Sequence, residues 1–339
     1  MASILGTLSE LITPETITHI SKAMSVDESV VTKGVAVAGP TLLGSLAQTS
    51  GTTEGAAALM KLIPQDVGVS SESMLSTLLV GLTKGGNASD VMNNALGPGV
   101  NAISSTLSHT AGFNIRPMLV MFAPLVLGLM SKAAKTDKLD ASGLTEMLTR
   151  ESATFMSDPA NTEAAGVVHG ALQAGNQAAA LRKTFDDVDW MKVRMAPIAA
   201  LYLVSMAAPS STTGEAHEIQ AAADTVTDAV KNATPTSLLN TVFGDELTRN
   251  ELDILKRDAP PTEKMLSTIK DAVKVVSVKD FAGAKAYGAM VMAVATNVAN
   301  ADAEGGFLGI GAKKVTTEEQ ETLDAIYAAI GHPASASAN

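Results

Sequence analysis

Apolar residues recur every three or four positions along nearly the whole chain, and this spacing constrains the fold more than any other feature. It places the apolar side chains on one face of an α-helix. Clusters of Gly, Pro, Asn and Ser interrupt the pattern, and Thr13 followed by Pro14 is typical of a helix start. Because convincing alternating strands are absent from the sequence, it predicts an all-α fold. The clearest helical segments are Ile4–Ile12, Ile17–Met24, Val30–Leu46, Ala56–Ile63, Leu266–Val276 and Ala282–Val298.

The residue types indicate how these helices pack. Of 339 residues, 46% are apolar and 17% are charged, which argues against a disordered chain. Aromatic residues make up only 3%, so Ala, Gly, Leu, Val and Met must build the core. Length and texture predict a helical domain at 1–155, a linking helix at 156–186, a second helical domain at 187–331 and a flexible tail at 332–339.

A repeat within the first predicted domain indicates an internal duplication. Pro40–Gly44 reads PTLLG and Pro124–Gly128 reads PLVLG, and each stands in an apolar helix that a shorter helix precedes. One unit of this kind cannot bury its apolar face alone, whereas two units packed together can. The repeated prolines and glycines are therefore expected to be packing devices at the centre of the domain.

The repeated segments, the triplets Leu8-Ser9-Glu10 and Leu144-Thr145-Glu146, and the Gly-, Ala- and Leu-rich texture resemble the YidB-like family of bacterial proteins. This resemblance covers residues 1–155. It implies a helical domain for which no biochemical activity is assigned.

The second predicted domain also has two similar halves. In each half an apolar helix leads into a turn of small or acidic residues and then into an amphipathic helix that begins with acids, at Ala207–Glu218 and at Ala299–Glu319. This order is similar to that of TerB-like (tellurite-resistance) helical domains. The resemblance covers residues 187–331 and implies a second internal duplication, with acidic residues in the turn and at the next helix start.

Asp302 and Glu304 in the acidic turn, together with Glu319, are the candidate ligands for a metal ion. Carboxylates from a turn and from a helix start could converge on a hard divalent cation such as Ca²⁺. The alternative is structural, since Thr316 and Glu319 fit the S/T-x-x-E capping box without an ion. The sequence leaves both open and predicts no other cofactor.

Between these acids lies a Gly-rich stretch with an apolar tip at Phe307, Leu308 and Ile310. It is not a phosphate-binding loop, because no Gly-Lys pair followed by Ser or Thr is present. Either the tip folds back onto its own domain, or it docks against another protein or a second copy of the chain. These three residues are the candidate partner-binding element.

Motifs for catalysis are not apparent in the sequence. The chain has no Cys, which excludes disulfides and thiolate chemistry, and its five His lack metal-binding spacing. His217, Asp224 and Asp228 fall on one face of a predicted helix, which is typical of a solvated acidic face. Only a deep pocket at His217 or at the acidic cluster 186–189 would favour an enzyme, so we expect none.

The net charge of −11 argues against nucleic acid and anionic membranes as partners. The N-terminal residues lack the features of a secretory signal. The apolar stretches Pro117–Met130 and Met195–Pro209 are shorter than the roughly 18 residues of a membrane span. We therefore expect a cytoplasmic bacterial protein without a transmembrane segment.

Two hypotheses for function follow. The first is a non-enzymatic interaction or scaffold protein, which binds a protein partner or assembles with itself as a homo-oligomer through its helical domains. The alternative is a divalent-ion-responsive module of the TerB type, in which Asp302, Glu304 and Glu319 bind the ion and Ca²⁺ stabilises the fold.

Overall fold

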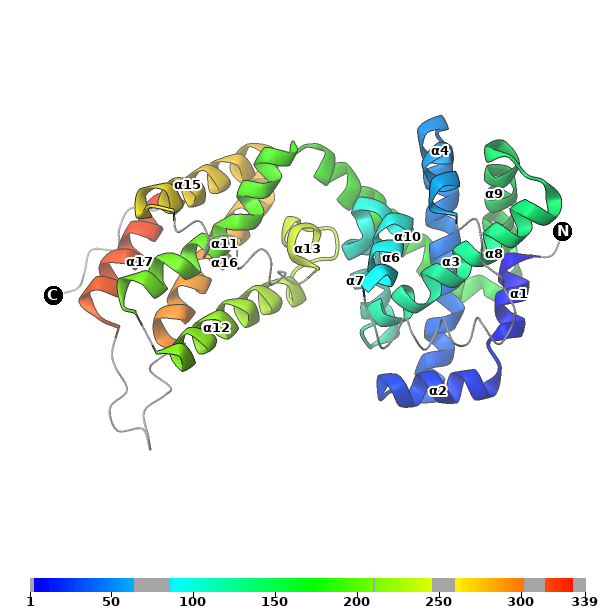
Figure 1. The fold of residues 1–339 in the computed structure, drawn as a ribbon, viewed down its shortest axis with the longest axis horizontal. Helices are drawn as coiled ribbons and strands as arrows, with labels where there is room; N and C mark the ends of the chain where they lie inside the picture. The colour runs from blue at the N-terminus through cyan, green and yellow to red at the C-terminus, as the bar shows by residue number, and fades with distance from the viewer. Residues whose placement is uncertain (1–2, 64–85, 210, 246–259, 302–314, 332–339) are drawn as a thin grey trace. The chain divides into compact units, whose positions relative to one another are not determined.

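The computed structural model describes residues 3–63, 86–209, 211–245, 260–301 and 315–331. The chain divides into two compact units, residues 1–179 and 180–339, each shown in Figure 1. All regular structure in the described ranges is helical, which confirms the predicted all-α fold. The predicted domain limits at 155 and 187, and the predicted internal duplications, stay predictions.

The first unit contains α1 (Ile4–Leu11), α2 (Pro14–Met24), α3 (Glu28–Ser50), α4 (Thr53–Leu62), α6 (Gly86–Leu96), α7 (Val100–Ala111), α8 (Arg116–Asp137), α9 (Ala141–Ser157) and most of α10 (Thr162–Lys183). Short 3₁₀ turns, η1 (Gly97–Gly99) and η2 (Pro159–Asn161), precede α7 and α10. The second unit contains α11 (Asp187–Ala207), α12 (Thr212–Lys231), α13 (Leu238–Phe243), α15 (Thr262–Lys279), α16 (Phe281–Ala301) and α17 (Thr317–Ile330).

Many of these helices begin at a short polar side chain that caps the first turn. The side-chain oxygen of the residue before the helix accepts the backbone N–H three residues further on, which satisfies a donor that the helix itself leaves unpaired. Thr13 caps α2 in this way ahead of Pro14, as the sequence predicts. The other residues that do so are Ser3, Thr52, Asp140, Asp186, Ser211, Ser237 and Thr316.

The core of the first unit is built around α3 and α8, which pack against each other. Each helix has an interior proline, Pro40 in α3 and Pro124 in α8. All residues of α3 from Val37 to Leu46 are buried, as are most residues of α8 from Met118 to Ser131. The two repeated motifs therefore lie in the most buried parts of this unit.

By length and composition alone, α3 and α8 could each cross a membrane. In the structure, 67% of each apolar stretch is buried inside the protein. A buried core helix of a soluble protein has the same length and composition, so this finding is weak evidence for a membrane span.

Close approach between helices depends on glycine in the first unit. A side-chain carbon added at Gly44 would lie 2.7 Å from Cδ1 of Leu172 on α10. At Gly99, in η1, the neighbour is the backbone of Gly175 on α10, and an added Cβ would lie 2.7 Å from its Cα. Gly44 is thus a packing device, as the repeat predicts, whereas the contact between Gly99 and Gly175 has no signal in the sequence.

The second unit is organised around α11, which packs against α15 and α16 (Figure 1). Residues 193–201 of α11 are all buried. The fully buried Tyr287 of α16 donates a hydrogen bond to the carbonyl oxygen of Val193 at 2.7 Å, and burial raises the pKa of its hydroxyl. Buried Arg194 donates to the carbonyl of Val242 and to Asp245 at 3.2 Å, which ties α11 to the end of α13.

Candidate functional site

Five of the predicted site residues lie outside the described residues. Asp302 and Glu304 of the predicted metal site, and Phe307, Leu308 and Ile310 of the predicted partner-binding tip, all fall within 302–314. Glu319 is the predicted ligand that the structure describes. The metal and partner roles of this stretch therefore stay predictions.

Both the carboxylate and the backbone N–H of Glu319 form hydrogen bonds with Thr316 at the start of α17. Its carboxylate accepts the backbone N–H of Thr316 at 2.7 Å, and its own N–H donates to the hydroxyl of Thr316 at 3.1 Å. This reciprocal pair is the capping box that the sequence offers as the structural alternative. Within the described ranges, no three His, Cys, Asp or Glu side chains are close enough to hold a metal ion.

A shallow polar pocket of about 540 Å³ brings His217, Asp224 and Asp228 together on α12, beside Asn297 and Asn300 of α16. The sequence places the first three on one helix face, and the structure agrees. Asp224 accepts a hydrogen bond from Gln220 at 2.8 Å, and Asp228 lies 3.7 Å from the ammonium of Lys231. These local pairs along the exposed face of α12 are typical of a hydrated surface.

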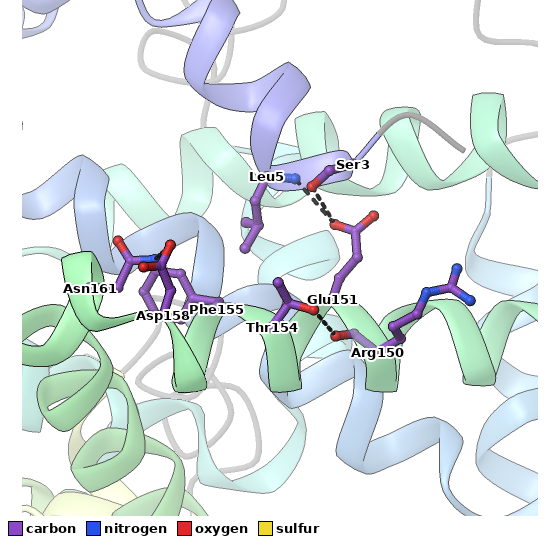
Figure 2. A pocket seen from close by; sticks show the side chains of 8 residues that line it. All are labelled: Ser3, Leu5, Arg150, Glu151, Thr154, Phe155, Asp158 and Asn161. Carbon is purple, nitrogen blue, oxygen red and sulfur yellow. Dashed lines mark hydrogen bonds between the residues drawn. The ribbon is translucent and has the colours of Figure 1, made fainter.

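A second open pocket, of about 560 Å³, lies where α9 meets the start of α1 (Figure 2). Its central group is Glu151, whose carboxylate accepts the N–H groups of Ile4 at 2.9 Å and Leu5 at 3.3 Å and the hydroxyl of Ser3 at 3.2 Å. A carboxylate is favourable at this position because the first N–H groups of a helix carry partial positive charge. Glu151 is therefore used to dock α1 onto α9.

A different kind of surface occurs where α10 ends and α11 begins. The rings of Phe185 and Trp190 meet edge to face with centroids 5.7 Å apart, and the guanidinium of Arg182 lies 4.5 Å over the Trp190 ring. We call this connection between α10 and α11 the elbow. Lys279, at the end of α15, reaches the elbow and donates a hydrogen bond to the carbonyl oxygen of Thr184 at 2.7 Å. The ammonium of Lys279 also lies 5.5 Å from the centroid of the Phe185 ring, so this cation–π contact and the bond to Thr184 join the elbow to the α15–α16 turn.

The charges at the elbow are paired with one another. Asp189 accepts hydrogen bonds from Lys192 at 3.2 Å and lies 3.2 Å from Lys279, while Arg182 binds Asp187 at 2.6 Å. Lys192 and Lys279 lower the pKa of Asp189 below its ordinary value of 3.8. The acidic cluster 186–189 thus has structural roles, since Asp186 caps α11 and Asp189 joins α11 to α15.

Around these paired charges the structure exposes apolar side chains. In the described part of the chain, five large apolar side chains are at least half exposed, and four of them lie within two positions of Asp189 or Lys279. They are Val188 (66%), Met191 (50%), Val278 (78%) and Phe281 (86%). We call these four residues the elbow patch. The ion pair between Asp189 and Lys279 brings the two segments that carry these residues together. Because exposed apolar side chains that lie near one another mark interaction surfaces, the elbow patch is the candidate functional site.

The ion pairs beneath the elbow patch predict how its stability depends on pH. Because the pKa of Asp189 is lower in the folded chain, its carboxylate stabilises the fold above pH about 4, and this stability is lost as the pH falls through the folded pKa. We expect Asp189→Asn to lower the urea midpoint at pH 7, and the difference from wild type to shrink as the pH falls below the ordinary pKa of 3.8 and through the lower folded pKa. Trp190 fluorescence reports this unit, and an equal difference at both pH values would contradict the prediction.

Sequence analysis did not identify the elbow patch. Val188 and Met191 stand at the start of a helix whose later residues are buried, and Val278 and Phe281 flank a helix boundary. The signal in the sequence is that Phe281 stands between two predicted helices, of which one ends at Val276 and the next begins at Ala282. Which apolar residues stay exposed depends on long-range contacts such as Lys279 with Thr184, and periodicity does not report those.

The first unit is similar to a known protein family. Residues 6–133 match the model of a family described as "Bacterial protein of unknown function (DUF937)". This supports the expectation that the N-terminal part resembles a bacterial family without an assigned activity. No curated protein and no solved structure matches the chain. The finer likeness to YidB-like and TerB-like proteins stays a prediction.

Proposed function

We propose that this chain is a non-enzymatic interaction protein that binds protein through the elbow patch. The observation that carries the proposal is the grouping of Val188, Met191, Val278 and Phe281 around the ion pair between Asp189 and Lys279. Exposing four apolar side chains to water is unfavourable because of the hydrophobic effect. A complex in which a partner covers them is therefore stabilised.

The elbow suits binding because it is already ordered. The cation–π, ring and ion-pair contacts fix the two segments that carry the patch, so association does not have to order them. Its charged neighbours also pair within the chain, which lowers the desolvation cost when a partner covers them. Met191 adds an adaptable side chain, of a type common at binding surfaces.

The polar pockets support a binding role over catalysis. Glu151 is used to dock α1, and the acids near His217 pair with neighbours along their own helix. We further propose that the chain acts as a homo-oligomer or scaffold in the bacterial cytoplasm. That setting follows from the net charge of −11 and the absence of Cys from the sequence.

The native size of the chain in cell extract tests this function. We expect the wild type to elute well above its chain mass of 34.7 kDa, and Val278→Asp/Phe281→Asp to elute close to it, because two carboxylates in the patch oppose burial. Met206, at the far end of α11 and 53% exposed, gives the matched control, and Met206→Asp should elute like wild type. The proposal fails if the patch variant keeps the wild-type size.

A further inference from the structure

We propose that the second unit binds a small apolar molecule with a cationic end, in the cavity between α11, α12, α13 and α16. This cavity has a volume of about 370 Å³ and is more enclosed than the two polar pockets. None of the described residues that line it belongs to the elbow patch, so the inference goes beyond the proposed function.

The base of the cavity is apolar. An apolar cavity of about 150 Å³ binds benzene, so this one has room for a longer apolar body. Its volume falls in the lower part of the range for ligand sites, about 300–1,000 Å³, and such sites often lie between the helices of a bundle. The side chains at the base come from all four helices, and each is at most 5% exposed: Ile198, Leu201, Val226, Phe243 and Val294.

The cavity exists because α12 presents short side chains to it. Ala222 and Ala223 line the cavity where larger apolar side chains would fill it. The amide of Asn297 on α16 donates a hydrogen bond to the hydroxyl of Thr225 at 2.8 Å, which fixes the spacing between α12 and α16. A larger side chain at position 223 is therefore expected to take the place of a ligand.

Buried hydrogen bonds fix the other walls of the cavity. Pro197 lines it and has no backbone N–H, so the carbonyl of Val193, four residues earlier, lacks its helical partner. The hydroxyl of Tyr287 donates to that carbonyl at 2.7 Å and ties α16 to α11. Arg194 ties α13 to α11 through the carbonyl of Val242. The cavity is thus ordered before a ligand arrives, which lowers the cost of binding.

The mouth of the cavity carries a carboxylate. Gln220 and Asp224 are exposed, and both line this cavity and the polar pocket at His217. The amide of Gln220 donates to one oxygen of Asp224 at 2.8 Å and so positions the carboxylate. Asp224 is the one charged side chain among the described residues that line the cavity. Because its charge attracts a protonated amine and repels a carboxylate or a phosphate, it selects a ligand with a cationic end.

Titration calorimetry of the full-length chain with phenylbutylamine and phenylbutyrate tests this site. The two probes have similar apolar bodies and opposite charges. We expect saturable binding of the amine, and binding of the carboxylate that is weaker by about fivefold or more. Asp224→Asn should remove most of this difference, because it removes the charge and keeps the size of the side chain.

A second variant separates the cavity from the rest of the surface. Ala223→Leu should weaken binding of phenylbutylamine by about tenfold or more, because the leucine side chain occupies the cavity. Leucine is a good helix former, so the variant should fold. Ala216→Leu is the matched control, since Ala216 is exposed on the same helix and does not line the cavity, and it should bind like wild type. Unchanged circular dichroism confirms that both variants are folded.

The inference is overturned by any of the following results. If phenylbutylamine shows no saturable binding to wild type, the cavity does not take a ligand of this class. If binding is unchanged in Ala223→Leu, the amine binds elsewhere on the chain. If the two probes bind wild type equally, Asp224 does not select for charge, and the assignment of a cationic ligand is wrong.

Discussion

Replacing Gly99 with Ala is expected to destabilise the first unit by about 3 kcal/mol. The added Cβ would lie 2.7 Å from both Cα and the carbonyl carbon of Gly175, and closer still to its oxygen. The neighbour is helix backbone, so it cannot rotate away as a side chain could. The φ of −89° and ψ of 1° at Gly99 are allowed for alanine, so the expected loss comes mainly from the steric clash.

Gly166→Ala on the same helix as Gly175 is the matched control. An added Cβ at Gly166 meets nothing within 4 Å, so alanine should raise stability by about 0.5–1 kcal/mol through its better helix propensity. The readout is urea unfolding followed by far-UV circular dichroism. The single Trp, Trp190, lies in the second unit, and its fluorescence transition should not move in either variant. A Gly99→Ala protein as stable as wild type would show that η1 and α10 do not pack this closely.

Arg194→Met should lower the stability of the second unit by about 2–4 kcal/mol. The Arg194 side chain is 10% exposed and donates to the carbonyl of Val242, itself a buried residue, and to the carboxylate of Asp245. Methionine fills similar space but donates nothing, so the link between α11 and the end of α13 is lost. The Trp190 fluorescence midpoint is the measurement.

Asp245→Asn separates the ion pair from the bond to the backbone. The side chain of Asp245 is 45% exposed, so water screens its charge, and the expected loss is below about 1 kcal/mol. Arg194 keeps its bond to Val242 in this variant. Equal losses for Arg194→Met and Asp245→Asn would mean that the ion pair, and not the bond to Val242, holds α13.

Much of the fold follows from local rules. The three- and four-residue period predicts the helices that became α1 to α4, α15 and α16, and the caps at Thr13 and Thr316 lie where the sequence places them. Long-range contacts do not follow in this way. Gly99 and Gly175 are 76 positions apart in a chain with 27 glycines, and no local pattern marks this pair as the one that brings two backbones together.

The same distinction between local rules and long-range contacts applies to the candidate site. His217 and Asp224 share one face of α12 because of their spacing along that helix, and the capping box at Glu319 likewise depends on spacing at the start of α17. Both features were predictable from the sequence. The elbow patch is formed because Lys279 reaches across to Thr184 and Asp189, which brings two helix ends together and leaves Phe281 in water. Whether an apolar residue stays exposed depends on which other side chains pack over it, and therefore on the packing of the whole unit.

The most direct test of the elbow patch is a photo-crosslinking probe at its most exposed residue. Benzoylphenylalanine in place of Phe281, in the full-length chain in cells, should give a discrete protein adduct on irradiation. The same probe at Met206 should not, and Val278→Asp should abolish the adduct at 281. Equal adducts at both positions, or none at Phe281, would contradict the account that this chain works by binding protein through the elbow patch.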